Sequence, residues 1–206
     1  MEEAAIELPN GARVPAAPGR YRVVPVPDLN EVDDERFLLE YDFPYLYVRE
    51  IEEGQVFDWY VRHPRANGNI GLDRSGYQFF MSTSSRARGN QRQFMPDISY
   101  VDERTWSRLS PEEKLRAYLP CVPVVVIELM SQTDRIADLQ AKVSKFISTG
   151  TREGVIVDTR HNRVWIYNKG QRPYFAPLAP IEFDWWPGFT LDCIAIRDAR
   201  VRARLS

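Results

Sequence analysis

The strongest constraint on the fold is one apolar run and the segment that follows it. Residues 123–129 read PVVVIEL, so four aliphatic residues are followed at once by the carboxylate of Glu128. A run of this length, rich in β-branched residues, is typical of a strand covered on both faces. The next segment places apolar residues at helical spacing and stops at Gly150; the stripe consists of Ile136, Leu139, Val143, Phe146 and Ile147.

A hairpin signal follows this strand and helix. Two β-rich runs, residues 155–158 and 164–167, surround the polar turn TRHN. A crossover through residues 132–150 makes the two strands that it joins parallel neighbours, and the hairpin partner is then antiparallel. The order strand, helix, strand, strand predicts an α/β or α+β domain with a mixed sheet.

The preceding half of the chain gives weaker signals. Asn30 is expected to cap a helix that Pro44 ends, and Ser110 with Pro111 is expected to start a helical turn within residues 102–118. Strands are expected at YQFFMS and at FMPDISYV, the latter interrupted at Pro96. Ser131 and Asp134 have capping-box spacing before the long helix.

Length and composition indicate one domain with two unlike ends. The 206 residues suit a single domain of ordinary size. Residues 1–30, rich in Pro, Ala and Gly, are expected to form an N-terminal arm with one short extended segment at 21–26. Residues 31–196 are expected to form the domain, and 197–206 an arginine-rich tail.

Charge and cysteine content exclude some classes of protein. The net charge of -2 argues against binding nucleic acid by bulk attraction, so such binding must depend on local patches. Cys121 and Cys193 form no disulfide framework and no zinc motif, and His63 and His161 lie in no metal-ligand pattern. No signal peptide is visible, and no apolar run reaches the roughly 20 residues that span a bilayer. We expect a cytoplasmic protein.

Asp97 and Glu128 are the candidate metal ligands. Each lies beside a short hydrophobic run, and if these runs are neighbouring strands, the two acids converge at one end of the sheet. Two close carboxylates repel unless a cation lies between them. Mg²⁺ (or Mn²⁺) suits such a site because it binds through one or two carboxylates and keeps positions for water and phosphate oxygens.

Lys142 is the candidate catalytic cation. It lies about 90° from the centre of the apolar stripe, so it can lean over the sheet edge, whereas Lys145 points nearly opposite the stripe. Simpler explanations exist for each residue. An acid after a buried strand often only marks the chain leaving the core, and Asp138 has the spacing to form an i,i+4 ion pair with Lys142.

An ordered set of motifs adds a family resemblance. PD at residues 96–97, IELMS around Glu128, LQAK ending at Lys142, GVIVD at 154–158 and GFTLD near 188–192 occur in this order. From residue 76 through 167 and again at 187–192, the chain resembles the Uma-two family of predicted restriction endonucleases, which belongs to the PD-(D/E)XK nuclease superfamily. The resemblance implies a restriction-endonuclease-like α/β fold, with a central mixed β-sheet flanked by helices.

The resemblance also assigns roles to single residues. It implies Asp97 and Glu128 as metal ligands. The superfamily pattern would put a lysine where this chain has Met130, and Lys142 of the following helix fits as its replacement. Asp158, at a strand end, is expected to be structural. A further acid from upstream is left open; the candidates are Glu40 and Glu50.

The resulting hypothesis is a Mg²⁺-dependent endonuclease that hydrolyses DNA. Arg86, Arg88 and Arg92 precede Asp97 in a polar loop, so we expect them to contact DNA phosphates, with the arginine-rich tail as a second candidate. One alternative is a catalytically inactive module of nuclease fold that binds nucleic acid or a protein partner, which Met130 favours. Another is an interaction protein that uses the aromatic surface at Trp185 and Trp186. A homodimer is left open.

Overall fold

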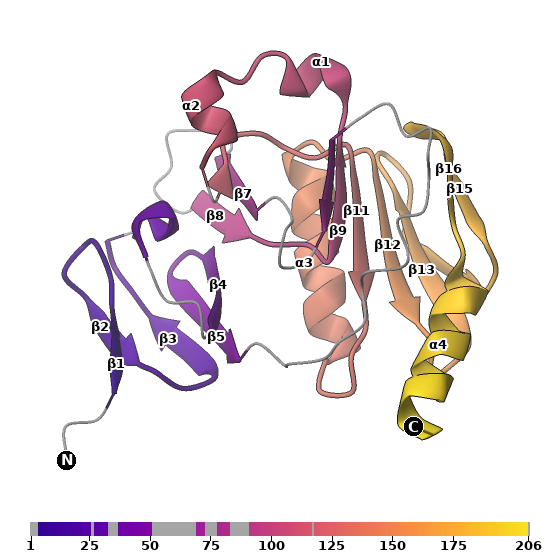
Figure 1. Ribbon diagram of the computed structural model, residues 1–206, viewed down its shortest axis with the longest axis horizontal. Coiled ribbons are helices and arrows are strands. Elements are labelled where there is room, and N and C mark those ends of the chain that lie inside the picture. The colour runs from indigo at the N-terminus through magenta and orange to yellow at the C-terminus, as the bar shows by residue number, and fades with distance from the viewer. Residues whose placement is uncertain are drawn as a thin grey trace. The chain divides into compact units, whose positions relative to one another are not determined.

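The protein divides into two compact units that are interleaved along the chain. The structure is a computed structural model, and it describes residues 4–25, 27–32, 37–50, 69–72, 78–82, 91–116 and 118–205 (Figure 1). Unit 1 comprises residues 1–55, 77–95 and 109–121, and unit 2 comprises residues 56–76, 96–108 and 122–206.

Unit 1 is built mainly from strands. Its six-stranded sheet has the order β10-β7-β8-β4-β5-β3, and β1 and β2 form a separate antiparallel pair. The bounds are β1 (Ala5–Glu7), β2 (Arg13–Pro15), β3 (Gly19–Arg22), β4 (Phe37–Asp42), β5 (Tyr45–Glu50), β7 (Gln78–Ser82), β8 (Gln91–Phe94) and β10 (Tyr118–Leu119), with a 3₁₀ turn η1 (Leu29–Glu31) and the short helix α2 (Pro111–Lys114).

The helix expected after Asn30 is wrong. β4 occupies this segment and pairs antiparallel with β5 across a turn at Phe43 and Pro44. Leu39 and Tyr41, two residues apart, are both buried in the core of unit 1, as strand periodicity requires.

Residues 4–25 are more structured than expected. Ile6, Leu8 and Val14, from and next to the β1–β2 pair, are buried in the core of unit 1. The strand in this region, β3, lies at Gly19–Arg22 and overlaps the extended segment that we expected at 21–26 only at residues 21 and 22. The division into an arm, one domain and a tail stays a prediction.

Unit 2 contains the predicted mixed sheet. Its strand order is β14-β13-β12-β11-β9-β6, and β15 and β16 form a second, two-stranded sheet. The bounds are β6 (Asn69–Leu72), β9 (Ile98–Val101), β11 (Val125–Leu129), β12 (Glu153–Asp158), β13 (Arg163–Asn168), β14 (Tyr174–Pro177), β15 (Ile181–Phe183) and β16 (Trp186–Leu191), with the helices α1 (Glu103–Trp106), α3 (Ile136–Thr149) and α4 (Cys193–Leu205).

The predicted connections within this sheet are confirmed. β11 runs parallel to β12, which pairs antiparallel with β13. β9 is the other neighbour of β11 and is antiparallel to it. The strand that begins just after Asp97 and the strand that carries Glu128 therefore lie side by side.

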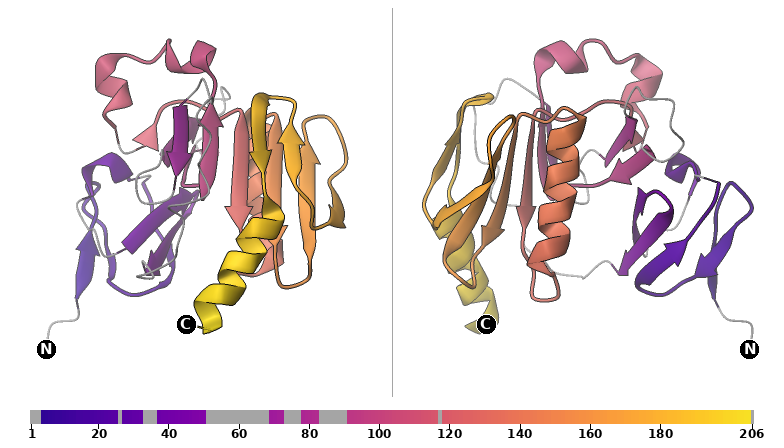
Figure 2. Two further views of the ribbon diagram at one scale, coloured as in Figure 1. Left: turned by 45° about the vertical axis from the view of Figure 1, so that its right-hand side comes forward. Right: turned by 180° about the vertical axis from the view of Figure 1, so that it is seen from behind.

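The two faces of the sheet are covered by different elements. Figure 2 shows α4 in front of the strands in its left-hand view and α3 in front of them in its right-hand view. Leu139, Val143 and Phe146 of α3 are buried. On the opposite face, side chains of β11 and β12 pack with β16 and α4; this cluster includes Ile127, Leu129, Val157, Trp186, Phe189 and Ile196.

Two of the helix ends expected from the sequence are present in the structure. The capping box at Ser110 is present, and Gly150 ends α3 with a φ of +150°. The capping box expected at Ser131 is wrong, because α3 begins only at Ile136. The Asp134 carboxylate instead accepts a hydrogen bond from the Ser131 N–H, at 2.7 Å, in the turn before the helix.

Among the described residues, no helix is long and apolar enough to cross a membrane.

Candidate active site

The candidate site lies where β11 ends, in unit 2. Strand alternation places Ile127 and Leu129 in the apolar cluster beneath α4. Glu128, between them, projects to the other face, toward α3. Its side chain is 2% exposed, so this carboxylate is removed from bulk water and requires a partner.

Lys142 of α3 is that partner. Its Nζ lies 3.0 Å from Glu128 Oε1 and donates a hydrogen bond to Oε2 at 3.2 Å. The lysine side chain is 9% exposed. α3 thus lays its apolar stripe on the sheet and, from the flank of that stripe, delivers one ammonium group to the buried carboxylate.

Asp97 meets the same strand from the β9 side. Its Oδ2 accepts a hydrogen bond from the Leu129 N–H at 2.5 Å. The register of β9 with β11 pairs Ile98 with Ile127, so the same register continued by one residue sets Asp97 opposite Glu128. Opposite residues of an antiparallel pair share one face, with Cβ atoms about 4.5–5.5 Å apart.

Comparison with known proteins identifies the family. Residues 55–192 match the model of the Uma2 family, described as "Putative restriction endonuclease". The chain belongs to the Uma2 family. The resemblance to the Uma-two family is thereby confirmed.

A solved structure supports the same fold. A crystal structure from Anabaena variabilis ATCC 29413, described as a putative nuclease belonging to DUF820, is similar over 82% of this chain and 94% of its own, with a TM-score of 0.60 and 18% sequence identity. No curated protein matches the chain. The restriction-endonuclease-like α/β fold expected from the sequence is confirmed.

Met130 is the departure from the nuclease pattern. It follows Glu128 by two positions and is 7% exposed. A thioether carries no positive charge, so Met130 cannot act as the motif lysine. In this Uma2 protein, the Lys142 ammonium forms an ion pair with the Glu128 carboxylate.

The donor set would suit a divalent ion that leaves most of its coordination positions to water. In the described part of the chain, no three His, Cys, Asp or Glu side chains group together as a metal site. Mg²⁺ takes few protein ligands, usually one or two carboxylates, and retains several waters. Asp97 and Glu128 would supply these carboxylates, and both come from the same end of neighbouring strands.

The other acids have different surroundings. Glu40 is buried in unit 1, where its Oε1 accepts a hydrogen bond from the Met95 N–H at 2.8 Å. The side chain of Glu50 lies outside the described residues. As a further ligand, each stays a prediction.

Asp158 organises the β12–β13 turn. It accepts hydrogen bonds from His161 Nδ1, at 2.8 Å, and from Arg163 Nε, at 3.0 Å, and is fully buried. Burial raises the pKa of this carboxyl, but the bonds from His161 and Arg163 outweigh it and hold the pKa below its ordinary value. These contacts explain Asp158 as a turn residue.

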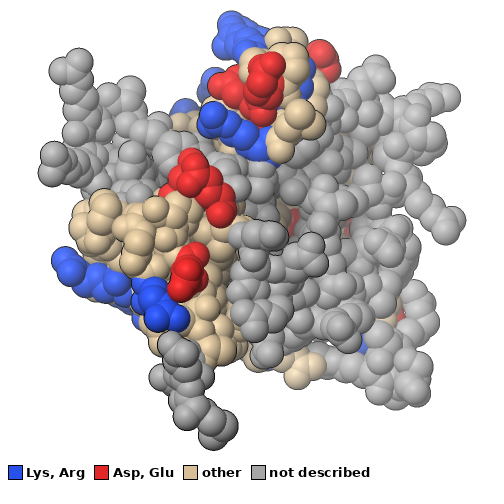
Figure 3. Space-filling view, turned by 60° about the vertical axis from the view of Figure 1, so that its left-hand side comes forward, with Lys and Arg blue, Asp and Glu red and all other residues tan. Residues whose placement is uncertain are grey.

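The basic loop lies largely outside the residues that the structure describes. Residues 83–90, with Arg86 and Arg88, and the side chain of Arg92 lie outside the described residues. On the face in Figure 3, the described basic and acidic side chains intermingle. DNA contact by these three arginines stays a prediction.

The adjacent tryptophans differ in environment. Trp186 is 1% exposed and stacks on Tyr100 and Phe189, with ring centroids 4.7 Å and 3.8 Å away. Trp185 is 48% exposed, and the Arg152 guanidinium lies over its ring. Trp186 therefore belongs to the core.

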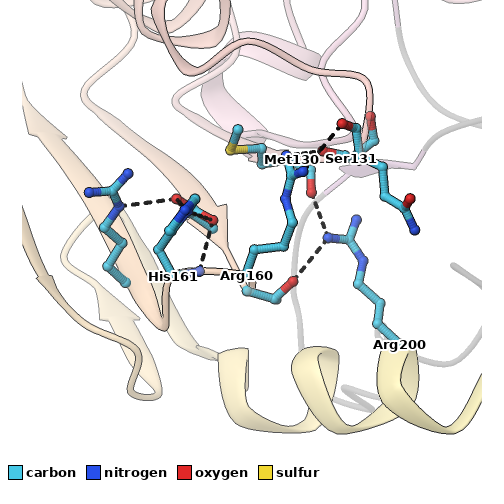
Figure 4. Close-up of polar contacts among 9 residues, drawn as sticks. Met130, Ser131, Arg160, His161 and Arg200 are labelled. Atoms are coloured by element: carbon cyan, nitrogen blue, oxygen red, sulfur yellow. Dashed lines mark hydrogen bonds and ion pairs between the residues drawn. The ribbon is translucent and has the colours of Figure 1, made fainter. Parts of the chain in front are cut away.

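Two arginines that the sequence did not assign to this site hold the end of β11. Arg160 and Arg200 donate hydrogen bonds to backbone carbonyls between residues 129 and 132 (Figure 4). No periodic pattern distinguishes them from the other arginines of the chain.

Proposed function

We propose that the protein is a Mg²⁺- or Mn²⁺-dependent endonuclease that hydrolyses DNA phosphodiester bonds. The observation that carries the proposal is the buried pair of Glu128 and Lys142 at the end of a strand in a Uma2-family fold. Asp97 hydrogen-bonds the next residue of that strand. Acid, acid and lysine thus come from three separate segments of unit 2.

Asp97 and Glu128 are the proposed metal ligands. A divalent ion bound there would supply Lewis-acid stabilisation of the charge that develops on the phosphodiester. The hydrogen bond to the Leu129 N–H occupies one oxygen of Asp97 and fixes the carboxylate at the strand end.

Lys142 is the proposed catalytic cation. In the described contact its ammonium is shared between the two Glu128 oxygens, which holds it beside the proposed metal site. From there it can orient the attacking water or donate to a phosphoryl oxygen as negative charge accumulates. Water adds to phosphorus as the bond to the leaving oxygen breaks, and the products are a phosphate monoester and a hydroxyl.

A second candidate function rests on Met130. Without the motif lysine, the fold can serve as a module that binds nucleic acid or a protein partner and does not cut. The contact of Lys142 with Glu128 opposes this alternative, because it supplies an ammonium where the pattern requires one. Cytoplasmic location and a homodimer stay predictions from the sequence.

Nicking of supercoiled plasmid tests the proposal. Asp97→Asn and Glu128→Gln each remove one charge and keep the size of the side chain and a hydrogen-bonding oxygen. Loss of several kcal/mol of charge stabilisation predicts at least about a 100-fold slower reaction. Glu182→Gln, an exposed acid on β15, is the matched control and is expected to cut like the wild type.

The two functions give different results. Cutting that requires Mg²⁺ or Mn²⁺ and fails in both site variants supports the endonuclease. Divalent-dependent binding of the plasmid by the wild type without nicking supports the binding module. Equal nicking by the wild type and both site variants would remove these residues from the mechanism.

A further inference from the structure

The chain leaves the sheet after Leu129, the last residue of β11, and side chains take over several of the backbone hydrogen bonds there. The Met130 N–H still donates to the Val157 carbonyl, at 3.1 Å. On the β9 side, the Asp97 carboxylate accepts from the Leu129 N–H in place of a strand partner. The carbonyls of residues 129 to 132 turn to two arginines.

Arg200 holds the first two of these carbonyls. Its Nη1 donates to the Met130 carbonyl at 2.6 Å and to Thr159 Oγ1 at 3.3 Å, and its Nη2 donates to the Leu129 carbonyl at 3.4 Å. Figure 4 shows this guanidinium reaching from α4 to Met130. Arg200 is partly buried, so these bonds are partly shielded from water.

Arg160 holds the next two carbonyls from a different element. It lies in the β12–β13 turn, and its Nη2 and Nη1 donate to the carbonyls of Ser131 and Gln132, at 2.9 Å and 3.3 Å. Arg160 is exposed. Arg200 therefore connects Leu129 and Met130, the residues that directly follow Glu128, to α4, and it lies 70 positions after Met130 in the sequence.

We infer that Arg200 is a positioning residue for Glu128. This rests on the proposed function. A guanidinium presents its donors in a rigid planar fork, so bonds to two consecutive carbonyls fix the peptide between Leu129 and Met130. That peptide begins one residue after Glu128. Arg200 therefore restrains the backbone next to Glu128 and, through it, the direction in which the Glu128 carboxylate projects.

The inference changes the role of the C-terminal helix. α4 follows residue 192, where the family match ends, and its arginines were expected to contact DNA phosphates as part of a basic tail. Arg200 instead turns inward to the strand end. α4 thereby becomes a support for the active site as well as a cover for the sheet.

Amide hydrogen exchange tests the positioning directly, without metal or DNA. In Arg200→Met, exchange of the Leu129 and Met130 amides is expected to accelerate about 10-fold or more, because the carbonyl clamp is lost. Arg197→Met is the matched control; Arg197 lies one turn earlier on α4 and bonds Asp198 and Asn162. It is expected to leave these two amides unchanged.

Mn²⁺ binding, measured by calorimetry on the full chain, tests the consequence for Glu128. Partners that orient metal ligands typically contribute 10- to 100-fold in affinity, so Arg200→Met is expected to weaken Mn²⁺ binding by about 10-fold or more. Arg200→Lys, which can hold one carbonyl and not both, is expected to lie between Arg200→Met and the wild type in both measurements.

Each outcome decides a separate point. Unchanged exchange at Leu129 and Met130 in Arg200→Met overturns the clamp. Faster exchange with unchanged Mn²⁺ affinity overturns its role in positioning Glu128. If Glu128→Gln binds Mn²⁺ like the wild type, the proposed metal site fails and Arg200 has no Glu128 site to position, whereas the exchange result still decides whether the clamp exists.

Discussion

A carboxylate shielded from water destabilises a fold unless a cation accompanies it, and at Glu128 that cation is Lys142. The two side chains are 2% and 9% exposed, so neither charge is well hydrated. In a protein that had no use for charge here, an apolar pair of similar volume would serve stability as well or better. The retention of both charges at a strand end is the reason to place chemistry at this point.

Removing the lysine is therefore expected to destabilise the protein. Lys142→Met leaves Glu128 buried without its ammonium partner and is expected to lower the free energy of unfolding by about 3 kcal/mol, measured by urea denaturation. Lys145→Met, three positions along α3, is the control and is expected to cost less than about 1 kcal/mol.

A double variant separates stability from chemistry. Glu128→Gln combined with Lys142→Met removes both charges and is expected to regain much of the lost stability, yet to leave plasmid uncut. Equal stability losses in Lys142→Met and Lys145→Met would contradict the account of the buried pair.

Asp158 predicts part of the acid sensitivity. Its pKa in the folded protein lies below the ordinary value of 3.8, because bonds from His161 and Arg163 outweigh the effect of burial. The resulting stabilisation is complete above pH 3.8 and is lost as the pH falls below that value and through the folded pKa.

Asp158→Asn is accordingly expected to lower the melting temperature most at neutral pH, with a difference from the wild type that shrinks below pH 3.8. The melting temperatures of both proteins between pH 2 and pH 7 measure this. Asp198→Asn, at an exposed ion pair on α4, is the comparison. A difference that stays constant over the whole range would show that Asp158 does not stabilise the fold through its charge.

At the scale of elements, the site depends on how closely α3 approaches the sheet. Gly154 on β12 permits this approach, because a Cβ at that position would lie 2.5 Å from Val143 Cγ1. Gly154→Ala is expected to push α3 outward and to lower the free energy of unfolding by about 1–3 kcal/mol.

A double-mutant cycle checks the cause. Val143→Ala removes the methyl groups that an alanine at 154 would meet, so the two changes together are expected to cost less than the sum of the single variants. Strict additivity would show that Gly154 matters for backbone reasons and not for packing against α3.

Local patterns were sufficient for β11, α3, β12 and β13 because each has a clear signal, either a short β-rich apolar run or a helical apolar stripe, and a clear end. They were insufficient where periods overlap. Phe37 and Tyr41 are four residues apart, which suits a helix, whereas Leu39 and Tyr41 alternate as a strand requires. Pairing with β5 decides in favour of the strand, and that partner cannot be read from the segment itself.

The residues of the candidate site also divide into those that local patterns predict and those that depend on a distant partner. Asp97 and Glu128 were selected because each lies beside an apolar run, and Lys142 because of its angle on the helix; the structure brings Lys142 to Glu128. Arg200 was missed as a structural group, since nothing in an arginine-rich tail indicates which arginine folds back onto a strand end.

At the scale of the whole molecule, DNA binding has to overcome a net charge of -2. Binding through Arg86, Arg88 and Arg92 predicts an affinity that falls with salt. Replacing all three by glutamine is expected to reduce the slope of log affinity against log salt by about 2–3, by counterion release. Fluorescence anisotropy with labelled duplex DNA measures this.

The control for charge is Arg104→Gln with Arg108→Gln, two basic residues in and just after α1. A salt slope that changes equally in both variants would assign the effect to net charge and not to the loop.

The central claim is that Asp97 and Glu128 hold one divalent ion beside Lys142. Anomalous scattering from crystals soaked in Mn²⁺ tests it most directly. The account predicts a single anomalous peak about 2.0–2.2 Å from an oxygen of each carboxylate. A map with no peak there, or with Mn²⁺ bound only elsewhere in the molecule, would contradict it.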